Sequence, residues 1–324
     1  MWHVRGMSIH LTEHEIKTAL SSWYGMEPDS LALLNGFYDK NYLVKVGRES
    51  FFLKIYGFDK LPAIRFQLSF IDACVKAGLP MAAVMPTRTG KSFFAVGDHY
   101  GSLQVCLSGK QLRLGRLTTG MMEEVGGILG KIHKLTKGKT FPGKNWKKYP
   151  WDLSQFDLVI RDFRKVRERL PENLASLIEG VVADWNSHAV ELKKMRKGII
   201  HGDYHGGNIL VAKGACSGVV DFGDAMRGWY AGDVAIALAH VCFKGKGDPK
   251  DFMRAFLVGY SNHFRLNALE TNALPLLIRM RAATAIVEIV DASKHNEQEL
   301  YGKMFKEQMA VLQYLEGQKL RWQK

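Results

Sequence analysis

The chain has 324 residues, and its 45 Lys and Arg against 32 Asp and Glu give a net charge of +13. No apolar run approaches the roughly 20 residues of a membrane helix, and the first ten residues lack a signal-peptide core. The four cysteines form no CxxC pair, so neither a zinc site nor a disulfide framework is indicated. We therefore expect a cytoplasmic protein with no membrane partner. The charge is compatible with nucleic acid, an anionic membrane surface or anionic small molecules, but a solvated basic surface explains it more simply.

The first 108 residues are predicted to form a strand-rich lobe. A helix is expected over 11–25, where Thr12 and Glu15 have the spacing of a capping box. A second helix is predicted over 63–79, because its apolar residues repeat with a helical period. Apolar segments bounded by turn residues predict strands over 31–37, 41–46, 50–57, 92–98 and 101–109.

Residues 109–324 are predicted to be mostly helical. One helix face is formed by apolar residues at alternating spacings of four and three, namely Met121, Val125, Ile128, Ile132 and Leu135. Further amphipathic helices are expected over 156–170, 174–195, 234–242, 251–264 and 274–290. A strand-and-loop segment, 198–225, interrupts them. We therefore predict an α+β fold with two domains, a small antiparallel-sheet lobe over 1–108 and a larger helical lobe over 109–324, joined by a linker near 105–110.

The interrupting segment, "GIIHGDYHGGNILVAKGACSGVVDFGDA", places polar residues where short apolar strands end. A kinase catalytic loop has an Asp, four residues and then an Asn, followed by a DFG turn. The segment matches that pattern at His201, Asp203, Asn208, Asp221, Phe222 and Gly223. Each acid alone is explained as a turn cap, but the set in register favours phosphoryl transfer.

The chemistry of phosphoryl transfer suggests a role for each polar residue. Asp203 is the candidate base that accepts the proton of the acceptor hydroxyl. Asn208 and Asp221 offer a neutral and a charged oxygen, which suit a hard cation such as Mg²⁺.

Three stretches, "HGDYHGGNIL", "VVDFGDA" and "GDVAIAL", resemble the aminoglycoside phosphotransferase and choline kinase superfamily, whose members are small-molecule kinases with a protein-kinase-like fold. The sequence around the DFG is most similar to the homoserine kinase and hydroxylysine kinase branch. The specific part of the resemblance covers 198–243, and weaker similarity extends through the small lobe. It implies an enzyme that phosphorylates an alcohol group with ATP and Mg²⁺ as cofactors. Its implied partners are a nucleotide and a small hydroxyl compound; nucleic acid is disfavoured, and no oligomeric state is implied.

The resemblance also implies roles in the small lobe. Lys54 in "FFLKIY" matches the phosphate-binding lysine, and a lysine between apolar neighbours on a central strand is otherwise unfavourable. The backbone of Val105, Cys106 and Leu107 matches the hinge that contacts adenine. The stretch "LNGFYDKNY" lies where a phosphate loop belongs, although it lacks GxGxxG.

One position departs from the family pattern. The helix glutamate that pairs with the lysine is replaced by Gln67, whose neutral amide can position Lys54 but cannot balance its charge. Either catalysis is weakened, or another acid such as Asp72 substitutes. A kinase-fold protein that binds nucleotide without turnover is therefore an alternative to an active kinase.

In the large lobe, the resemblance implies that Asp233 braces the catalytic loop. Asp224 is either a metal or substrate contact or a turn residue. Arg227, Trp229 and Tyr230 are expected near the mouth of the acceptor pocket, where Arg227 could bind a carboxylate. A homoserine-like or other amino-acid or amino-alcohol acceptor therefore fits better than a polycationic antibiotic, because cations need acidic clefts. An aminoglycoside or macrolide phosphotransferase is the alternative.

Three other interpretations are weaker. A protein kinase needs an activation loop, but Asp221 and Asp233 are only 12 positions apart and no APE follows. The basic stretches lack the interleaved aromatic residues of a nucleic-acid platform. The spacing of His133, His205 and His240 fits no zinc template; we expect His133 and His240 to be structural and His205 to shape the catalytic loop.

Overall fold

The computed structural model describes residues 9–34, 39–57, 59–112, 117–141, 149–240, 247–293 and 298–316. The chain divides into two units. The first consists of Met1–Ser108, Phe141–Lys144 and Gly218–Val220, and the second of Gly109–Thr140, Asn145–Ser217 and Asp221–Lys324. No helix in the described ranges combines the length and apolar character that a membrane span requires.

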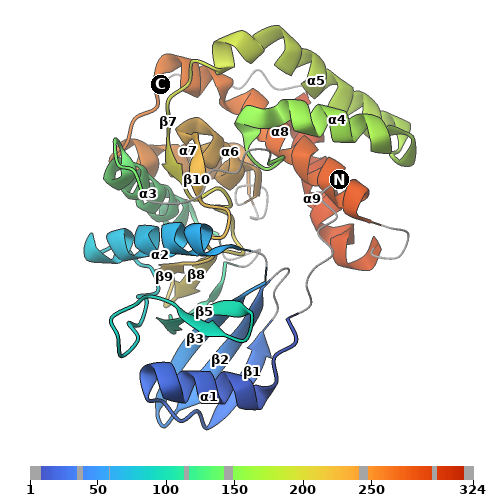
Figure 1. The fold of residues 1–324 in the computed structure, drawn as a ribbon. Coiled ribbons are helices and arrows are strands. Elements are labelled where there is room, and N and C mark those ends of the chain that lie inside the picture. The colour runs from blue at the N-terminus through green and yellow to red at the C-terminus, as the bar shows by residue number, and fades with distance from the viewer. Residues whose placement is uncertain are drawn as a thin grey trace. The chain divides into compact units, whose positions relative to one another are not determined.

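A five-stranded antiparallel sheet forms the centre of the first unit (Figure 1). Its order is β1-β2-β3-β5-β4, and it confirms the strands expected from the sequence. The strands are β1 (Ser30–Leu34), β2 (Lys40–Val46), β3 (Glu49–Tyr56), β4 (Phe94–Val96) and β5 (His99–Val105). The central strand, β3, alternates apolar residues toward one face with Lys54 toward the other, because successive side chains on a strand point in opposite directions.

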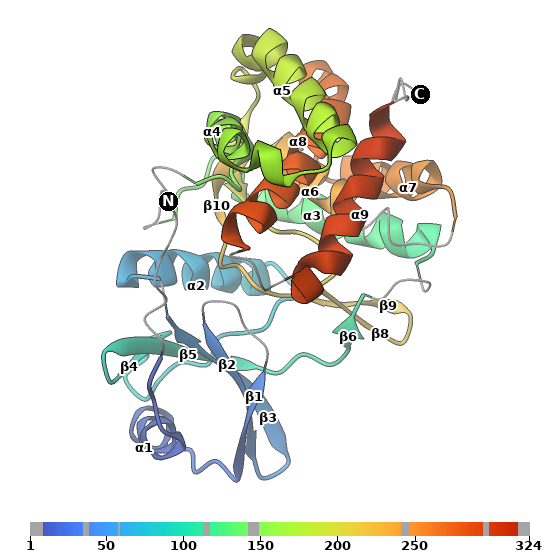
Figure 2. The ribbon, with the colours of Figure 1, turned by 90° about the vertical axis from the view of Figure 1, so that its right-hand side faces the viewer.

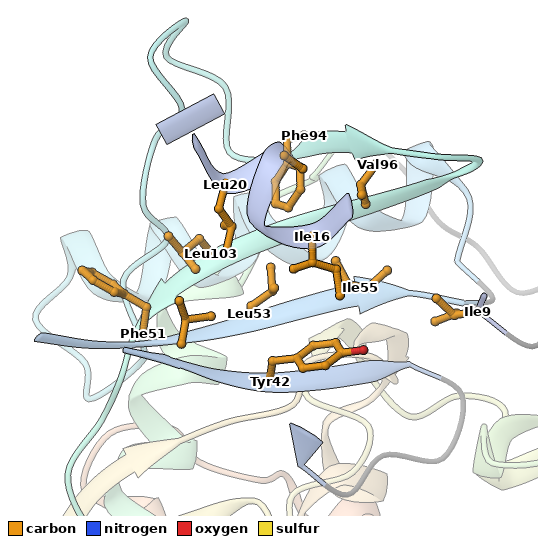
Figure 3. Packing of buried hydrophobic residues seen from close by; sticks show 12 residues of the cluster. Ile9, Ile16, Leu20, Tyr42, Phe51, Leu53, Ile55, Phe94, Val96 and Leu103 are labelled. Atoms are coloured by element: carbon orange, nitrogen blue, oxygen red, sulfur yellow. The ribbon is translucent and has the colours of Figure 1, made fainter. Parts of the chain in front are cut away.

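Helix α1 (Glu13–Tyr24) covers one face of this sheet, and its capping box between Thr12 and Glu15 is confirmed. Ile16 and Leu20 of α1 pack against residues of β3 and β5 such as Leu53 (Figure 3). Helix α2 (Leu61–Lys76) lies on the opposite face (Figure 1). Helices α1 and α2 therefore lie on opposite sides of the sheet (Figure 1).

The second unit is mostly helical, as the sequence predicts (Figure 2). Its helices are α3 (Thr119–Thr136), α4 (Phe156–Val166), α5 (Glu172–Leu192), α6 (Tyr230–His240), α7 (Pro249–Ser261), α8 (Ala268–Ala292) and α9 (Gln298–Glu316). Two short 3-10 turns, η1 (Leu153–Gln155) and η2 (Arg167–Arg169), precede and follow α4. The sequence analysis did not identify α9.

Helices α3 and α7 cross at a close approach that two glycines permit. A side-chain carbon on Gly259 would lie 1.8 Å from the carbonyl oxygen of Glu123, and one on Gly126 would lie 2.0 Å from that of Phe256. Because these obstacles are backbone atoms, no rotation of a side chain could relieve them. The crossing fixes α3, which carries His133.

Short strands carry the segment of interest. Strands β7 (Lys197–Ile200) and β10 (Met226–Trp229) form an antiparallel pair, while β6 (Lys110–Gln111), β8 (Ile209–Ala212) and β9 (Ala215–Val219) form a second sheet in the order β6-β8-β9. The β8–β9 turn uses Lys213 and Gly214, both with positive φ, as a tight hairpin requires. The polar residues of the predicted catalytic segment therefore lie in loops that leave β7 and β9.

Candidate active site

The predicted catalytic loop is residues 201–208, between β7 and β8. A buried carboxylate on α6 fixes its start, because Asp233 accepts the N–H of His201 at 2.8 Å and that of Gly202 at 3.0 Å. His133 contacts the same carboxylate at 3.0 Å through Nε2, and its Nδ1 lies 2.8 Å from the hydroxyl of Tyr260. The structure confirms that Asp233 braces the loop and that His133 is structural.

Gly202 allows the loop to turn against the DFG segment. Its φ is +82°, and a side-chain carbon there would lie 2.2 Å from the carbonyl oxygen of Asp224. Glycine is therefore required here both by the positive φ and by the lack of room for a side chain next to Asp224. The tight turn fixes the backbone of the residue that follows, Asp203.

Three side chains contact the carboxylate of Asp203. Arg281 donates from Nη2 to Oδ1 at 2.9 Å, while Asn208 donates to Oδ2 at 3.0 Å and His205 lies 3.0 Å from the same oxygen. Burial raises the pKa of this carboxyl, but His205 and Arg281 outweigh that effect and leave the pKa below its usual value. Asp203 is therefore ionised near neutral pH and is held to accept a hydrogen bond.

The contacts of His205 define the orientation of its ring and the nitrogen that carries the proton. The backbone N–H of Gly207 donates to Nδ1 at 2.9 Å, so in the neutral ring the proton is on Nε2. That proton points to Asp203, which confirms that His205 shapes the catalytic loop.

Asn208 and Asp221 present oxygen ligands that fit a hard cation. The amide nitrogen of Asn208 donates to the carbonyl and the carboxylate of Asp203, which leaves its Oδ1 for a cation. Asp221 is exposed and has a φ of +60°, in the left-handed region that few residues other than Gly, Asn and Asp adopt. No cluster of three His, Cys, Asp or Glu that could hold a metal occurs within the described ranges. Mg²⁺ characteristically needs few protein ligands, because phosphate oxygens and waters supply the others.

A second group of residues surrounds Asp203, and the sequence analysis missed most of it. The guanidinium carbon of Arg281, on α8, lies 4.4 Å from the centre of the Trp151 ring. Tyr149 donates its hydroxyl to Asp224, and its pKa is raised by burial and by Asp224, with smaller effects of Asp203 and Arg281. These residues thus form one polar cluster around the predicted base. The available signal is the presence of Arg279, Arg281 and Glu288 within the mostly apolar "LLIRMRAATAIVEIV".

The two aromatic residues expected at the acceptor mouth are buried. Trp229 is 1% exposed and packs against Trp185, while Tyr230 is 3% exposed and packs against His133. Arg227 is exposed on β10. None of the three contacts Asp203 in the described structure, so the acceptor contacts proposed below use other residues. Trp229 ends β10 and Tyr230 begins α6, and the packing of these two elements buries both side chains.

In the first unit, Lys54 is paired with an acid that the sequence analysis did not select. Its Nζ lies 2.8 Å from Oδ2 of Asp39, whose Oδ1 accepts the N–H of Gly57 at 3.0 Å. The expected substitute, Asp72, is instead 53% exposed and pairs with Lys76 at 2.7 Å. Asp39, which directly precedes β2, thus supplies the negative charge that Gln67 on α2 lacks.

Gln67 is buried on α2 and donates its side-chain amide to Asp59. An amide at this position therefore serves as the donor to a carboxylate, a role that a glutamate could not fill when ionised. This contact gives a physical reason for the departure from the family pattern.

The predicted hinge lies at the end of β5. Val105 and Cys106 are exposed, Leu107 is partly exposed, and the N–H of Val105 donates to the carbonyl of Ala83 at 2.8 Å. Of the predicted phosphate loop, residues 35–38 lie outside the described residues.

The chain was compared with known proteins. Residues 31–269 match the model of the phosphotransferase enzyme family. A homoserine kinase of Pseudomonas aeruginosa strain UCBPP-PA14 is 26% identical over 254 residues, which cover 78% of this chain and 77% of that protein. A hydroxylysine kinase of Xenopus laevis is 25% identical over 313 residues, which cover 86% of this chain and 82% of that one.

Solved structures share the fold. An amicoumacin kinase in complex with AMP-PNP and Ca²⁺ superposes with a TM-score of 0.72 at 17% identity, covering 94% of each chain. A microcompartment-associated aminopropanol kinase gives a TM-score of 0.66 at 18% identity and covers 94% of this chain and 97% of its own. The similarity extends over both units and confirms the predicted fold class.

Proposed function

The chain belongs to the phosphotransferase enzyme family, and we propose that it transfers the γ-phosphoryl group of ATP to the hydroxyl group of a homoserine-like small molecule. The observation that carries this proposal is the double hydrogen bond from Asn208 to Asp203, which joins a predicted metal ligand to the predicted base. The homoserine kinase and hydroxylysine kinase relatives support the choice of acceptor.

Asp203 orients the acceptor in this reaction. Its ionised carboxylate accepts the hydrogen of the acceptor hydroxyl, whose oxygen forms a bond to the γ-phosphorus as the bond to the β–γ bridging oxygen breaks. The proton passes to Asp203 as the new bond forms, and ADP leaves. Because the lowered pKa makes Asp203 a weak base, its main contribution is alignment of the hydroxyl.

Asn208 and Asp221 would hold Mg²⁺ through Oδ1 and the carboxylate. When bound, the ion neutralises charge on the β- and γ-phosphates. The two ligands differ in role, since only Asp221 brings a negative charge.

The first unit is proposed to bind the nucleotide and the second to carry the chemistry. Lys54 would contact the α- and β-phosphates, and Asp39 would keep its ammonium oriented. The backbone of Cys106 and Leu107, with Val105, would contact adenine. We place the reaction in the cytoplasm, where ATP is available. Nucleotide binding without turnover is less attractive, because Asp39 supplies the charge that Gln67 lacks.

The test measures ADP release by the purified full chain with ATP and Mg²⁺. The acceptors are homoserine, 5-hydroxylysine, 3-amino-1-propanol and kanamycin, and product is confirmed by mass spectrometry. We expect turnover of a hydroxy amino acid and a loss of kcat of about 10²–10⁴ in Asp203→Asn, with ATP binding retained. Efficient phosphorylation of kanamycin alone would establish the antibiotic alternative, and normal turnover by Asp203→Asn would remove that residue from its role.

A further inference from the structure

Arg281 has hydrogen-bonding capacity that the protein does not use. It is 3% exposed, and its Nη2 donates to Asp203. Its Nε and Nη1 are buried and have no hydrogen-bond partner among the described residues. An unsatisfied buried donor costs roughly 1–3 kcal/mol, so this arrangement needs an explanation.

A structural arginine of the same unit provides a contrast. Arg196 donates from Nε at 2.8 Å and from Nη2 at 2.5 Å to the two carboxylate oxygens of Glu270, and Nη2 also donates to the carbonyl of Arg265. Two nitrogens of its guanidinium group thus donate to the two oxygens of one buried carboxylate. Arg281 meets its acid through one nitrogen only, so positioning Asp203 does not account for the rest of its guanidinium.

The unused donors belong to the acceptor side of the site. Asp203 joins Arg281 to the place where the acceptor hydroxyl must bind in the proposed reaction. Trp151 stacks on the guanidinium and is itself only partly buried. A planar guanidinium held in this way is suited to a carboxylate, which accepts two parallel N–H bonds.

The charge of the cluster restricts the ligand further. Arg281 carries one positive charge, whereas Asp203 and Asp224 carry one negative charge each. A simple hydroxy acid would add a third negative charge, whereas a zwitterion adds none. Asp224, which already accepts a hydrogen bond from Tyr149, also offers a counter-charge to an ammonium group.

We propose that Arg281 binds the carboxylate of a zwitterionic hydroxy amino acid beside Asp203. The inference rests on the proposed function and names the group that selects its acceptor. It predicts that an amino alcohol lacking the carboxylate, or a hydroxy acid lacking the ammonium group, binds more weakly than the amino acid.

The experiment compares matched acceptors in matched variants. Homoserine, 3-amino-1-propanol and 4-hydroxybutyrate share the hydroxyl and differ in the two charged groups. Arg281→Lys keeps the charge but loses the fork, and Arg281→Gln removes both. Arg279→Gln, on the same helix with its ion pair to Asp184, is the control. Because any change at Arg281 also disturbs Asp203, the informative quantity is the ratio of kcat/KM for homoserine to that for 3-amino-1-propanol.

We expect Arg281→Lys to lower this ratio by about 10- to 100-fold, because the KM for homoserine rises. The KM for ATP should stay unchanged in Arg281→Lys, and the ratio should stay unchanged in the control variant Arg279→Gln. Equal losses on both acceptors would overturn the inference and leave Arg281 as a positioning residue, with the kinase function intact. Calorimetric binding of homoserine separates the two proposals. Binding that depends on Arg281 without turnover would contradict the proposed function only, and binding indifferent to Arg281→Gln would contradict the inference.

Discussion

Asp39 forms an ion pair with Lys54 at 2.8 Å and also accepts the backbone N–H of Gly57. The carboxylate is therefore fixed at both oxygens and restrains the lysine that is proposed to bind phosphates. We expect Asp39→Asn to raise the KM for ATP by about tenfold, because loss of a partly buried charge pair costs on the order of 1 kcal/mol or more.

The control for this prediction is Asp72→Asn. Asp72 pairs with Lys76 on the surface, and exposed pairs contribute little. A KM for ATP that is unchanged in Asp39→Asn, or equally raised in Asp72→Asn, would contradict the assignment.

Gln67→Glu tests the family departure. The change would place an ionised carboxylate against Asp59, so we expect a lower melting temperature and weaker ATP binding at pH 8. The family resemblance alone implies a different result, namely activity that is unchanged or raised, because a glutamate would restore the usual counter-charge. Combining Gln67→Glu with Asp59→Asn removes the repulsion and should recover most of the loss. Full stability of Gln67→Glu alone, measured by thermal unfolding at pH 8, would refute this interpretation.

Asp221→Asn separates the charge of the metal ligand from its backbone conformation. Asn tolerates the left-handed region that a φ of +60° requires, so folding should be unaffected. Loss of the charged ligand should abolish the Mg²⁺ dependence of nucleotide binding more completely than Asn208→Ala does. Isothermal titration of ATP with and without Mg²⁺ measures this, and unchanged MgATP binding in Asp221→Asn would disprove the metal role.

Glu288 on α8 gives a prediction about stability and pH. Burial, with Asp162 and Asp291, raises its pKa from 4.5 to about 7. The folded protein therefore binds this proton more tightly than the unfolded chain does. Stability is reduced as pH rises from about 4.5 to 7, and the full penalty persists at higher pH.

Replacing this residue with Gln should remove the penalty. We expect Glu288→Gln to be about 2–3 kcal/mol more stable than the wild type at pH 8, and equal to it near pH 4.5. Urea unfolding at several pH values measures the difference. Glu191→Gln, in an exposed pair with Lys194, should show no such trend. A gain that does not vary with pH would contradict the assignment.

The local part of this site could be predicted from the sequence, whereas its long-range contacts could not. The spacing of Asp203, Asn208 and Asp221, and the turns after β7 and β9, follow from residues close in the chain. Arg281 reaches Asp203 from a position 78 residues away, a contact set by how α8 packs. Asp39 pairs with Lys54 across a strand register that the sequence does not specify.

The brace formed by Asp233 has a consequence for hydrogen exchange. The amides of His201 and Gly202 belong to a loop, yet they donate to a buried carboxylate that is itself contacted by His133 of α3. These two amides can exchange with solvent only when the helical interior opens, so their exchange should be nearly as slow as that of the α6 backbone. We therefore expect the start of the loop to open on the timescale of the helical core rather than on that of a surface loop.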